Sequence, residues 1–104
     1  MPIAGLVKPF GKGKYKIYAG NTAGPSSYPS GGFDVQITGL SKVHAAVVIA
    51  GGGYLAEVAS ISGNTIKVKV NYFDYDAAGD GTAIEVPSGT DLSGVTFYVI
   101  AIGE

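Results

Sequence analysis

Glycine is the residue that most restricts what this chain can fold into. The sequence has 17 glycines in 104 residues, and most of them stand between short apolar runs. Glycine accepts the positive φ angles that turns need, and each glycine inside a helix costs about 1 kcal/mol. No window of a dozen residues keeps helical spacing without an interruption by glycine, proline or a β-branched residue. The pattern therefore excludes long helices and favours short strands joined by turns.

The segments between the glycines alternate apolar and polar residues with the two-residue period of β-strands. The clearest case is the segment 65–72, whose apolar face comprises Ile66, Val68, Val70 and Tyr72. The same pattern predicts further strands at 14–19, 33–38, 45–50, 54–61, 83–86 and 95–102. A tight turn at 62–64 is expected to join two of these strands into a hairpin.

Two of the expected strands carry apolar residues on both faces. The run 45–50 is apolar throughout, which predicts a strand that is covered on both sides. The run 95–102 is expected to lie at the centre of its sheet. Six to eight short strands at this spacing predict an all-β fold, either a small antiparallel β-sandwich or a β-barrel. Single helical turns, for example at 91–93, are the most helix that the pattern allows.

The length of the chain indicates one domain, which the composition divides into three parts. Residues 1–20 form a basic N-terminal arm with the first strand, 21–32 a loop rich in proline, serine and glycine, and 33–104 a β-rich body. The net charge is +4 through residue 42 and −5 after it, which together give −1. Charged residues make up 14% of the chain. A surface with so little charge protects poorly against association, so the composition favours a subunit of an assembly.

Several residue types are rare or missing, and their absence restricts the possible functions. The chain has no arginine and no cysteine. It therefore lacks the side chain best suited to specific nucleic-acid recognition, and it has no thiolate for a disulfide or a metal site. The longest apolar stretch, 43–50, is too short to cross a bilayer, and residues 1–10 do not resemble a secretion signal. We expect neither specific nucleic-acid binding nor a membrane span.

The sequence offers little for catalysis. His44 is the one histidine and stands at the entrance to an apolar strand, so we expect a structural or interfacial role for it. The triple glycine 51–53 is followed by an expected strand and lacks the Lys-Ser or Lys-Thr pair of a phosphate-binding loop. Nucleophilic catalysis needs a nucleophile beside a base, and no such arrangement is evident. We therefore predict that the chain is not an enzyme and has no catalytic residues and no cofactor.

The acidic loop that begins at residue 74 is the best candidate for a metal site. Carboxylates stand at the first, third and twelfth positions of a calcium-type loop, with glycine at the sixth. Alanine at the fifth position and flanking strands in place of helices depart from that pattern. Aspartate and glycine are also ordinary turn residues. We expect a solvated hairpin loop, and the alternative is a calcium site formed by Asp74, Asp76, Asp80 and Glu85.

The chain has seven tyrosines and four phenylalanines, and their densest group is Tyr72, Phe73 and Tyr75 beside the acidic loop. Aromatic side chains of this kind pack in cores, anchor protein interfaces, or stack on sugars and bases. We expect core and interface packing here. Carbohydrate binding through this group is the alternative.

Four short segments resemble those of small phage proteins encoded beside major capsid proteins. Segment 27–32, Ser-Tyr-Pro-Ser-Gly-Gly, resembles their Ser-Tyr-Pro-Thr-Gly-Gly, and 39–43 matches their Gly-Leu-Ser-Lys-Val. Segment 85–93 is similar to their Glu-Val stretch that ends in Gly-Thr-Asp-Leu-Ser, and 101–103 to their final Ala-Ile-Gly. The order and spacing of the segments carry the resemblance, which spans about three quarters of the chain.

This resemblance implies a virion structural protein, and specifically a capsid decoration (cement) protein on the outer capsid surface. The implied partners are the major capsid protein and further copies of the chain, as a homotrimer. The basic arm is expected to touch the capsid through Lys8, Lys12, Lys14 and Lys16. The alternatives are a tail-, neck- or fibre-associated subunit, a minor capsid subunit, or a carbohydrate-binding β module.

Overall fold

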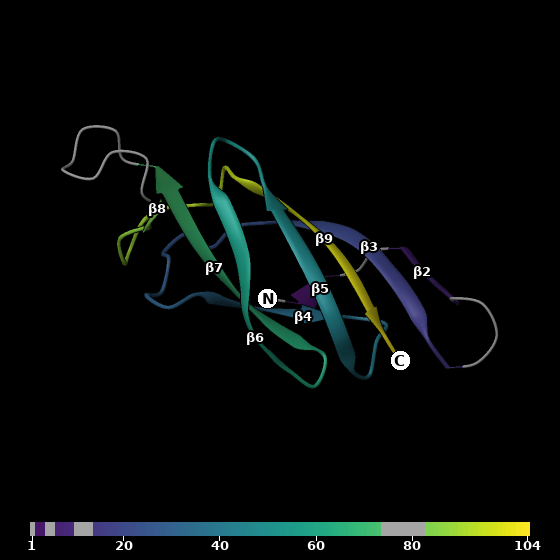
Figure 1. Cartoon of the computed structure of the whole chain (residues 1–104). Coiled ribbons are helices and arrows are strands. Elements are labelled where there is room, and N and C mark those ends of the chain that lie inside the picture. The colour runs from purple at the N-terminus through teal and green to yellow at the C-terminus, as the bar shows by residue number, and fades with distance from the viewer. Residues whose placement is uncertain (1, 4–5, 10–13, 74–82) are drawn as a thin grey trace.

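The computed structural model describes residues 2–3, 6–9, 14–73 and 83–104, and it contains strands and turns there but no helix. The strands form two sheets that pack face to face, which confirms the expected all-β fold and, of the sandwich and the barrel, gives the sandwich (Figure 1). Their bounds are β1 Pro2–Ile3, β2 Leu6–Pro9, β3 Lys16–Ala23, β4 Phe33–Ile37, β5 Val43–Ala50, β6 Leu55–Ser62, β7 Thr65–Phe73, β8 Ala83–Glu85 and β9 Thr96–Gly103. The described part of the chain holds no helix long and apolar enough to cross a membrane.

The two N-terminal strands belong to different sheets. Sheet I has the order β1-β4-β7-β6, and β8 pairs with the end of β7 beyond β4. Sheet II has the order β2-β3-β9-β5. The pairings in the described residues are antiparallel except that of β1 with β4, which is parallel. Strand β1 therefore extends sheet I and β2 extends sheet II, and neither strand is predicted by the alternation of the sequence.

The strands that the sequence does predict occur close to their expected positions. The predicted hairpin is confirmed: Gly63 and Asn64 join β6 to β7, and Gly63 has a φ of 60° that a residue with a side chain rarely adopts. The Asn64 side chain also donates a hydrogen bond to the carbonyl oxygen of Leu40, at 3.0 Å. The triple glycine 51–53 forms the connection between β5 and β6, which are edge strands of the two sheets and lie side by side (Figure 1).

The core lies between the two sheets and is formed by the inward residues of both. On β9 the burial alternates strictly, so that Phe97, Val99 and Ala101 are buried and their neighbours are exposed. Sheet I contributes the facing set, which comprises Val35, Ile37, Ile66, Val68 and Val70. Tyr18 of β3 is fully buried among them, and its hydroxyl has no hydrogen-bond partner in the described residues. Burial raises the pKa of this hydroxyl.

The loop expected at 21–32 is shorter in the structure, because residues 21–23 belong to β3, where they pair with β9. The remaining segment 24–32 is fixed by backbone hydrogen bonds to residues 87–95. Gly24 donates to the carbonyl of Val95, and Leu92 donates to that of Pro25. A side chain at Gly24 would collide with Leu92, because an added Cβ would lie 2.5 Å from the Leu92 carbonyl oxygen. Tyr28, further along the segment, is fully buried and packs edge-on against Phe33. The loop therefore closes one end of the sandwich.

The structure also differs from two other expectations drawn from the sequence. The prediction that 45–50 is covered on both faces is wrong, because Val47 and Ile49 are 60% and 59% exposed. The segment 91–93 forms a turn in which the Ser93 amide donates to the Asp91 carboxylate at 2.9 Å, and it contains no helical turn. The expected central position of the last strand is confirmed, since β9 lies between β3 and β5.

Candidate functional site

The outer face of sheet II is the most unusual surface of the described chain. We use the name face II for the outward residues of β3, β9 and β5. Directly opposed residues of antiparallel strands point to the same side of a sheet, so the register fixes which residues share this face. Three rows cross it, each with one residue from β3, β9 and β5 in that order: Ile17–Ile102–Ala45, Ala19–Ile100–Val47 and Asn21–Tyr98–Ile49.

Face II is apolar and exposed. Its five large side chains on β9 and β5 expose between 38% and 60% of their surface: Val47, Ile49, Tyr98, Ile100 and Ile102. None of the nine residues in the three rows is a lysine, an arginine, a histidine or a carboxylate. A contiguous apolar patch of several large side chains is about the largest that a monomeric soluble protein exposes, and such patches often mark surfaces that contact protein or other apolar partners.

The relief of face II follows from the sizes of its residues. On β3, positions 19 and 21 carry the short side chains of Ala19 and Asn21. A shallow hollow of about 460 Å³ lies there, bounded on the β9 side by Tyr98 and Ile100. On β5, by contrast, the branched side chains of Val47 and Ile49 stand out into solvent. The face therefore has a hollow along β3 and a ridge along β5, on the two sides of β9.

The outer face of sheet I, which we call face I, is polar. Lys67 of β7 forms an ion pair with Asp34 of β4 at 3.4 Å, and Lys69 forms one with Glu57 of β6 at 3.9 Å. These pairs are largely exposed to solvent. Face I thus has the charge expected of a surface that meets water, although Leu55 on β6 is also exposed.

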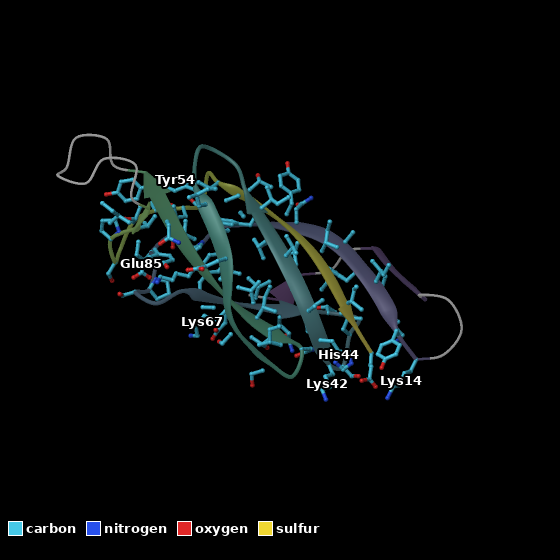
Figure 2. The ribbon with its side chains drawn as sticks, in the orientation of Figure 1. Lys14, Lys42, His44, Tyr54, Lys67 and Glu85 are labelled. Atoms are coloured by element: carbon cyan, nitrogen blue, oxygen red, sulfur yellow. The ribbon has the colours of Figure 1, made fainter. Side chains whose placement is uncertain are left out.

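A cluster of ionisable residues borders face II at the end where β9 finishes. Glu104 accepts a hydrogen bond from His44 at 2.6 Å and forms an ion pair with Lys14 at 3.3 Å. These two contacts, that with His44 foremost, hold the pKa of the Glu104 carboxyl below its usual range. Figure 2 shows Lys14, Lys42 and His44 gathered at this end of the molecule. His44 thus has a polar contact at the border of the face.

The four lysines expected to touch a capsid are placed as follows. Lys14 is exposed and bonded to Glu104, and Lys16 begins β3 and is exposed. Lys8 lies in β2, where its backbone pairs with Ile17, and Lys12 lies outside the described residues. The structure therefore places Lys14 and Lys16 near the ionisable end of face II.

The calcium alternative rests on residues that the structure describes only in part. Asp74, Asp76 and Asp80 lie outside the described residues, and Glu85 lies at the end of β8. One oxygen of Glu85, Oε2, accepts a hydrogen bond from the Tyr28 hydroxyl at 2.8 Å and another from the Gly31 amide at 2.7 Å. In the described part of the chain, no group of three or more carboxylates and histidines is placed to hold a metal ion.

The contacts of Glu85 explain why a tyrosine stands in the segment 27–32. The Tyr28 hydroxyl donates to Glu85 and accepts from the Val70 amide at 3.1 Å, so it joins the loop to both β7 and β8. The hydrogen bonds from Gly31 and Tyr28 keep the pKa of Glu85 low. Burial raises the pKa of Tyr28 to about 12. Both shifts favour a neutral tyrosine that donates to an ionised carboxylate.

A second hollow, of about 380 Å³, lies near the same end of the sandwich. Its lining includes Tyr54, Tyr72 and Pro87, together with the glycines of the β5–β6 connection. Tyr72 belongs to the aromatic group that the sequence singles out, whereas Tyr75 lies outside the described residues. Sequence spacing does not indicate Tyr54, because it is 18 residues away from Tyr72 and only the packing of the strands brings them together.

Comparisons of the chain with known protein families, with curated proteins and with solved structures found no match.

Proposed function

We propose that this chain is a structural subunit of a virion, and specifically a decoration protein that binds the outer surface of a capsid lattice. The observation that carries the proposal is face II. A sheet face with five exposed large apolar side chains and no charge in its three rows is suited to a protein that works inside an assembly.

The resemblance to small phage proteins directs the proposal toward virions. All four resembling segments place residues in the core: Tyr28 of 27–32, Leu40 and Val43 of 39–43, Val86 and Leu92 of 85–93, and Ala101 of 101–103. These segments are turn-rich, and turn-rich motifs recur by chance. A buried side chain in each segment gives a physical reason for the shared order and spacing of the segments. A common fold would therefore explain why the segments of this chain resemble those of the phage proteins.

The mechanism that follows is that of a clamp repeated many times over a lattice. The exposed Lys14 and Lys16 stand at the ionisable end of the sandwich, and we assign the contact with the capsid to this end. Each contact would be modest, because exposed ion pairs contribute about 0–1 kcal/mol each. Self-association through face II would join several such contacts in one unit, and linked contacts bind much more tightly than single ones.

The test is co-sedimentation with shells assembled from the major capsid protein of the same genome, before and after shell expansion. We expect the chain to pellet with expanded shells and to saturate at a fixed ratio. The double variant Lys14→Gln/Lys16→Gln should bind at least about tenfold more weakly, because it removes two charges at the contact. The matched control, Lys67→Gln/Lys69→Gln, removes the same charge from face I and should bind normally. A chain that stays in the supernatant with both kinds of shell would end the proposal.

The hollow lined by Tyr54 and Tyr72 supports a second candidate, carbohydrate binding. Tyrosine rings stack on the apolar faces of sugars, and a hollow of this size accepts one or two rings. This candidate predicts glycan binding that is lost in Tyr54→Ala and Tyr72→Ala. A glycan array on which the unaltered chain binds nothing would exclude it.

A further inference from the structure

Face II is complementary to itself. In the row through Ile100, the small Ala19 stands on one side and the large Val47 on the other. In the row through Tyr98, the β3 residue Asn21 is smaller than the β5 residue Ile49. In the row through Ile102 the order is reversed, because the β3 residue Ile17 is larger than the β5 residue Ala45. Each row therefore has a large residue at one edge and a smaller residue at the other.

We infer that face II is the contact between two copies of this chain, related by a two-fold axis that runs along β9. Such an axis lies between the copies and places β5 of each copy over β3 of the other. The ridge formed by Val47 and Ile49 then enters the hollow over Ala19 and Asn21. Ile17 covers Ala45 in the same way, and Tyr98 and Ile100 each meet their own counterpart.

The other two-fold arrangement fits less well. An axis that lies in the interface but crosses the strands would place β5 over β5 and β3 over β3. Ridge would then meet ridge, and the hollow of about 460 Å³ would face a second hollow and stay unfilled. Closely packed interfaces leave few voids, because an unfilled void forfeits the contacts of its lining. The relief of face II therefore selects the axis along β9.

The chemistry and the size of face II also favour a second copy over a different partner. The three rows have no charge that would need an opposite charge on a foreign protein. Side chains of this size each have on the order of 150–200 Å² of surface, so at their exposed fractions the five large ones expose roughly 390–520 Å² together. With the smaller residues included, two copies that close this face against each other would bury about 1,000–1,200 Å² in total, at the lower bound for a specific interface. Weak, concentration-dependent association is the expected result, as for other interfaces at this lower bound.

The geometry is that of two packed β-sheets. Sheets in β-sandwiches pack about 10 Å apart with their strands within roughly 30° of each other, and residues of the two faces interdigitate. The proposed pair would place sheet II of one copy against sheet II of the other, with both charged faces of sheet I outward. This inference shares face II with the proposed function, but it requires no capsid.

The experiment is a measurement of molecular mass by light scattering and sedimentation across a range of concentrations. The unaltered chain should shift from the mass of one chain to that of two. In Ile100→Lys the new charge would face its own counterpart across the axis, so association should weaken at least about 100-fold. The matched control Gln36→Lys adds the same charge at an exposed position of β4 and should associate normally. Circular dichroism would establish that both variants fold.

A mixing experiment tests the direction of the axis. Ala19→Glu and Val47→Lys should each be monomeric, because each places a charge against an apolar residue of the other copy. Mixed together, they should form pairs of one copy of each, since the carboxylate introduced at position 19 of one would face the ammonium group introduced at position 47 of the other. If the mixture stays monomeric, the axis along β9 is wrong.

The remaining outcomes decide between this inference and the proposed function. A chain that stays monomeric at all concentrations, or that forms a trimer, would overturn the two-fold inference whether or not it binds shells. A chain that forms pairs but does not pellet with shells would support the inference and remove the decoration role.

Discussion

Face I and face II are built on the same alternation of inward and outward residues, but they present different chemistry to the surroundings. On β7 the outward positions include Lys67 and Lys69, which pair with carboxylates of the neighbouring strands. On β9 the outward positions include Tyr98 and Ile100, which are half exposed and have uncharged neighbours on β3 and β5. Alternation alone determines which side of the sheet a residue is on. The residue types at outward positions then indicate whether that side meets water or protein.

The sharpest test of the comparison uses the two sides of one strand. Phe97 is fully buried and packs against Phe33 at a ring distance of 5.2 Å, whereas Tyr98 beside it is 52% exposed. We expect Phe97→Ala to lower the free energy of unfolding by about 3–5 kcal/mol, because it leaves a cavity in the core. At concentrations where the chain is monomeric, Tyr98→Ala should cost less than about 1 kcal/mol. Denaturant unfolding measures both. Equal losses would mean that face II is as buried as the core.

The hydrogen bonds of Tyr28 attach sheet I to the 24–32 loop, and their removal is expected to give the next largest change in the free energy of unfolding. Removing the hydroxyl in Tyr28→Phe leaves the buried Val70 amide without its acceptor and Glu85 without one of its donors. An unsatisfied buried donor costs about 1–3 kcal/mol, and we expect a loss of that size. Self-association should be unchanged, because Tyr28 is not on face II. A variant as stable as the unaltered chain would show that water replaces these bonds.

The same hydroxyl makes stability depend on alkaline pH. The pKa of Tyr28 is about 12 in the folded chain because of burial, compared with about 10 in the unfolded chain. The folded state therefore holds this proton more tightly, and the resulting stabilisation is complete below about pH 10 and is lost between about pH 10 and 12. The difference in unfolding free energy between the unaltered chain and Tyr28→Phe should shrink over this range. A constant difference would contradict the assignment.

Tyr18 offers a contrasting hydroxyl on sheet II. It is buried and has no hydrogen-bond partner among the described residues. Because the hydroxyl loses its contact with water and gains no hydrogen bond there, Tyr18→Phe should raise the free energy of unfolding, by up to about 1 kcal/mol. Thermal and denaturant unfolding of this variant beside Tyr28→Phe would give opposite signs. A loss of stability in Tyr18→Phe would indicate a bound water on the hydroxyl.

The smallest expected effect concerns the charges of face I. Glu57→Gln removes the ion pair with Lys69, and the side chains of Glu57 and Lys69 are 57% and 38% exposed. Exposed pairs of this kind contribute little, so we expect a change below about 0.5 kcal/mol that vanishes at high salt. Mass measurements should show the same association as in the unaltered chain. A loss of association in Glu57→Gln would place the contact between copies on face I.

Much of the fold is predictable from local patterns. The alternation of 65–72, the Gly63–Asn64 turn and the apolar run of β9 are all properties of neighbouring residues, and each is found where it is expected. Strands β1 and β2 are not predictable in this way. They are two and four residues long, and they form by pairing with β4 and β3, which lie later in the sequence.

The candidate site is less predictable than the fold, because it depends on whether solvent or protein covers the outer face of a sheet. The run 45–50 is apolar on both sides. A strand that is covered on both sides within one copy has this pattern. A strand that is covered on one side by its own sheet partner and on the other by a second copy would have the same pattern. The contacts of Glu104 with His44 and of Glu85 with Tyr28 join residues about sixty positions apart, so no local spacing indicates them. The exposure of face II is known only once both sheets are in place.

The order of strands in sheet II has a consequence for the synthesis of the chain. Strand β9 is paired on both sides, by β3 and β5, yet it is the last of the three to leave the ribosome. The hairpin β6–β7 and strand β4, by comparison, have all left the ribosome once residue 73 emerges, so sheet I can begin to pair while sheet II still lacks its middle strand. Until residue 103 emerges, β3 and β5 have open edges, and open edges are where nascent β-proteins aggregate. A polysome that is crowded with this chain would therefore depend on rapid closure by β9.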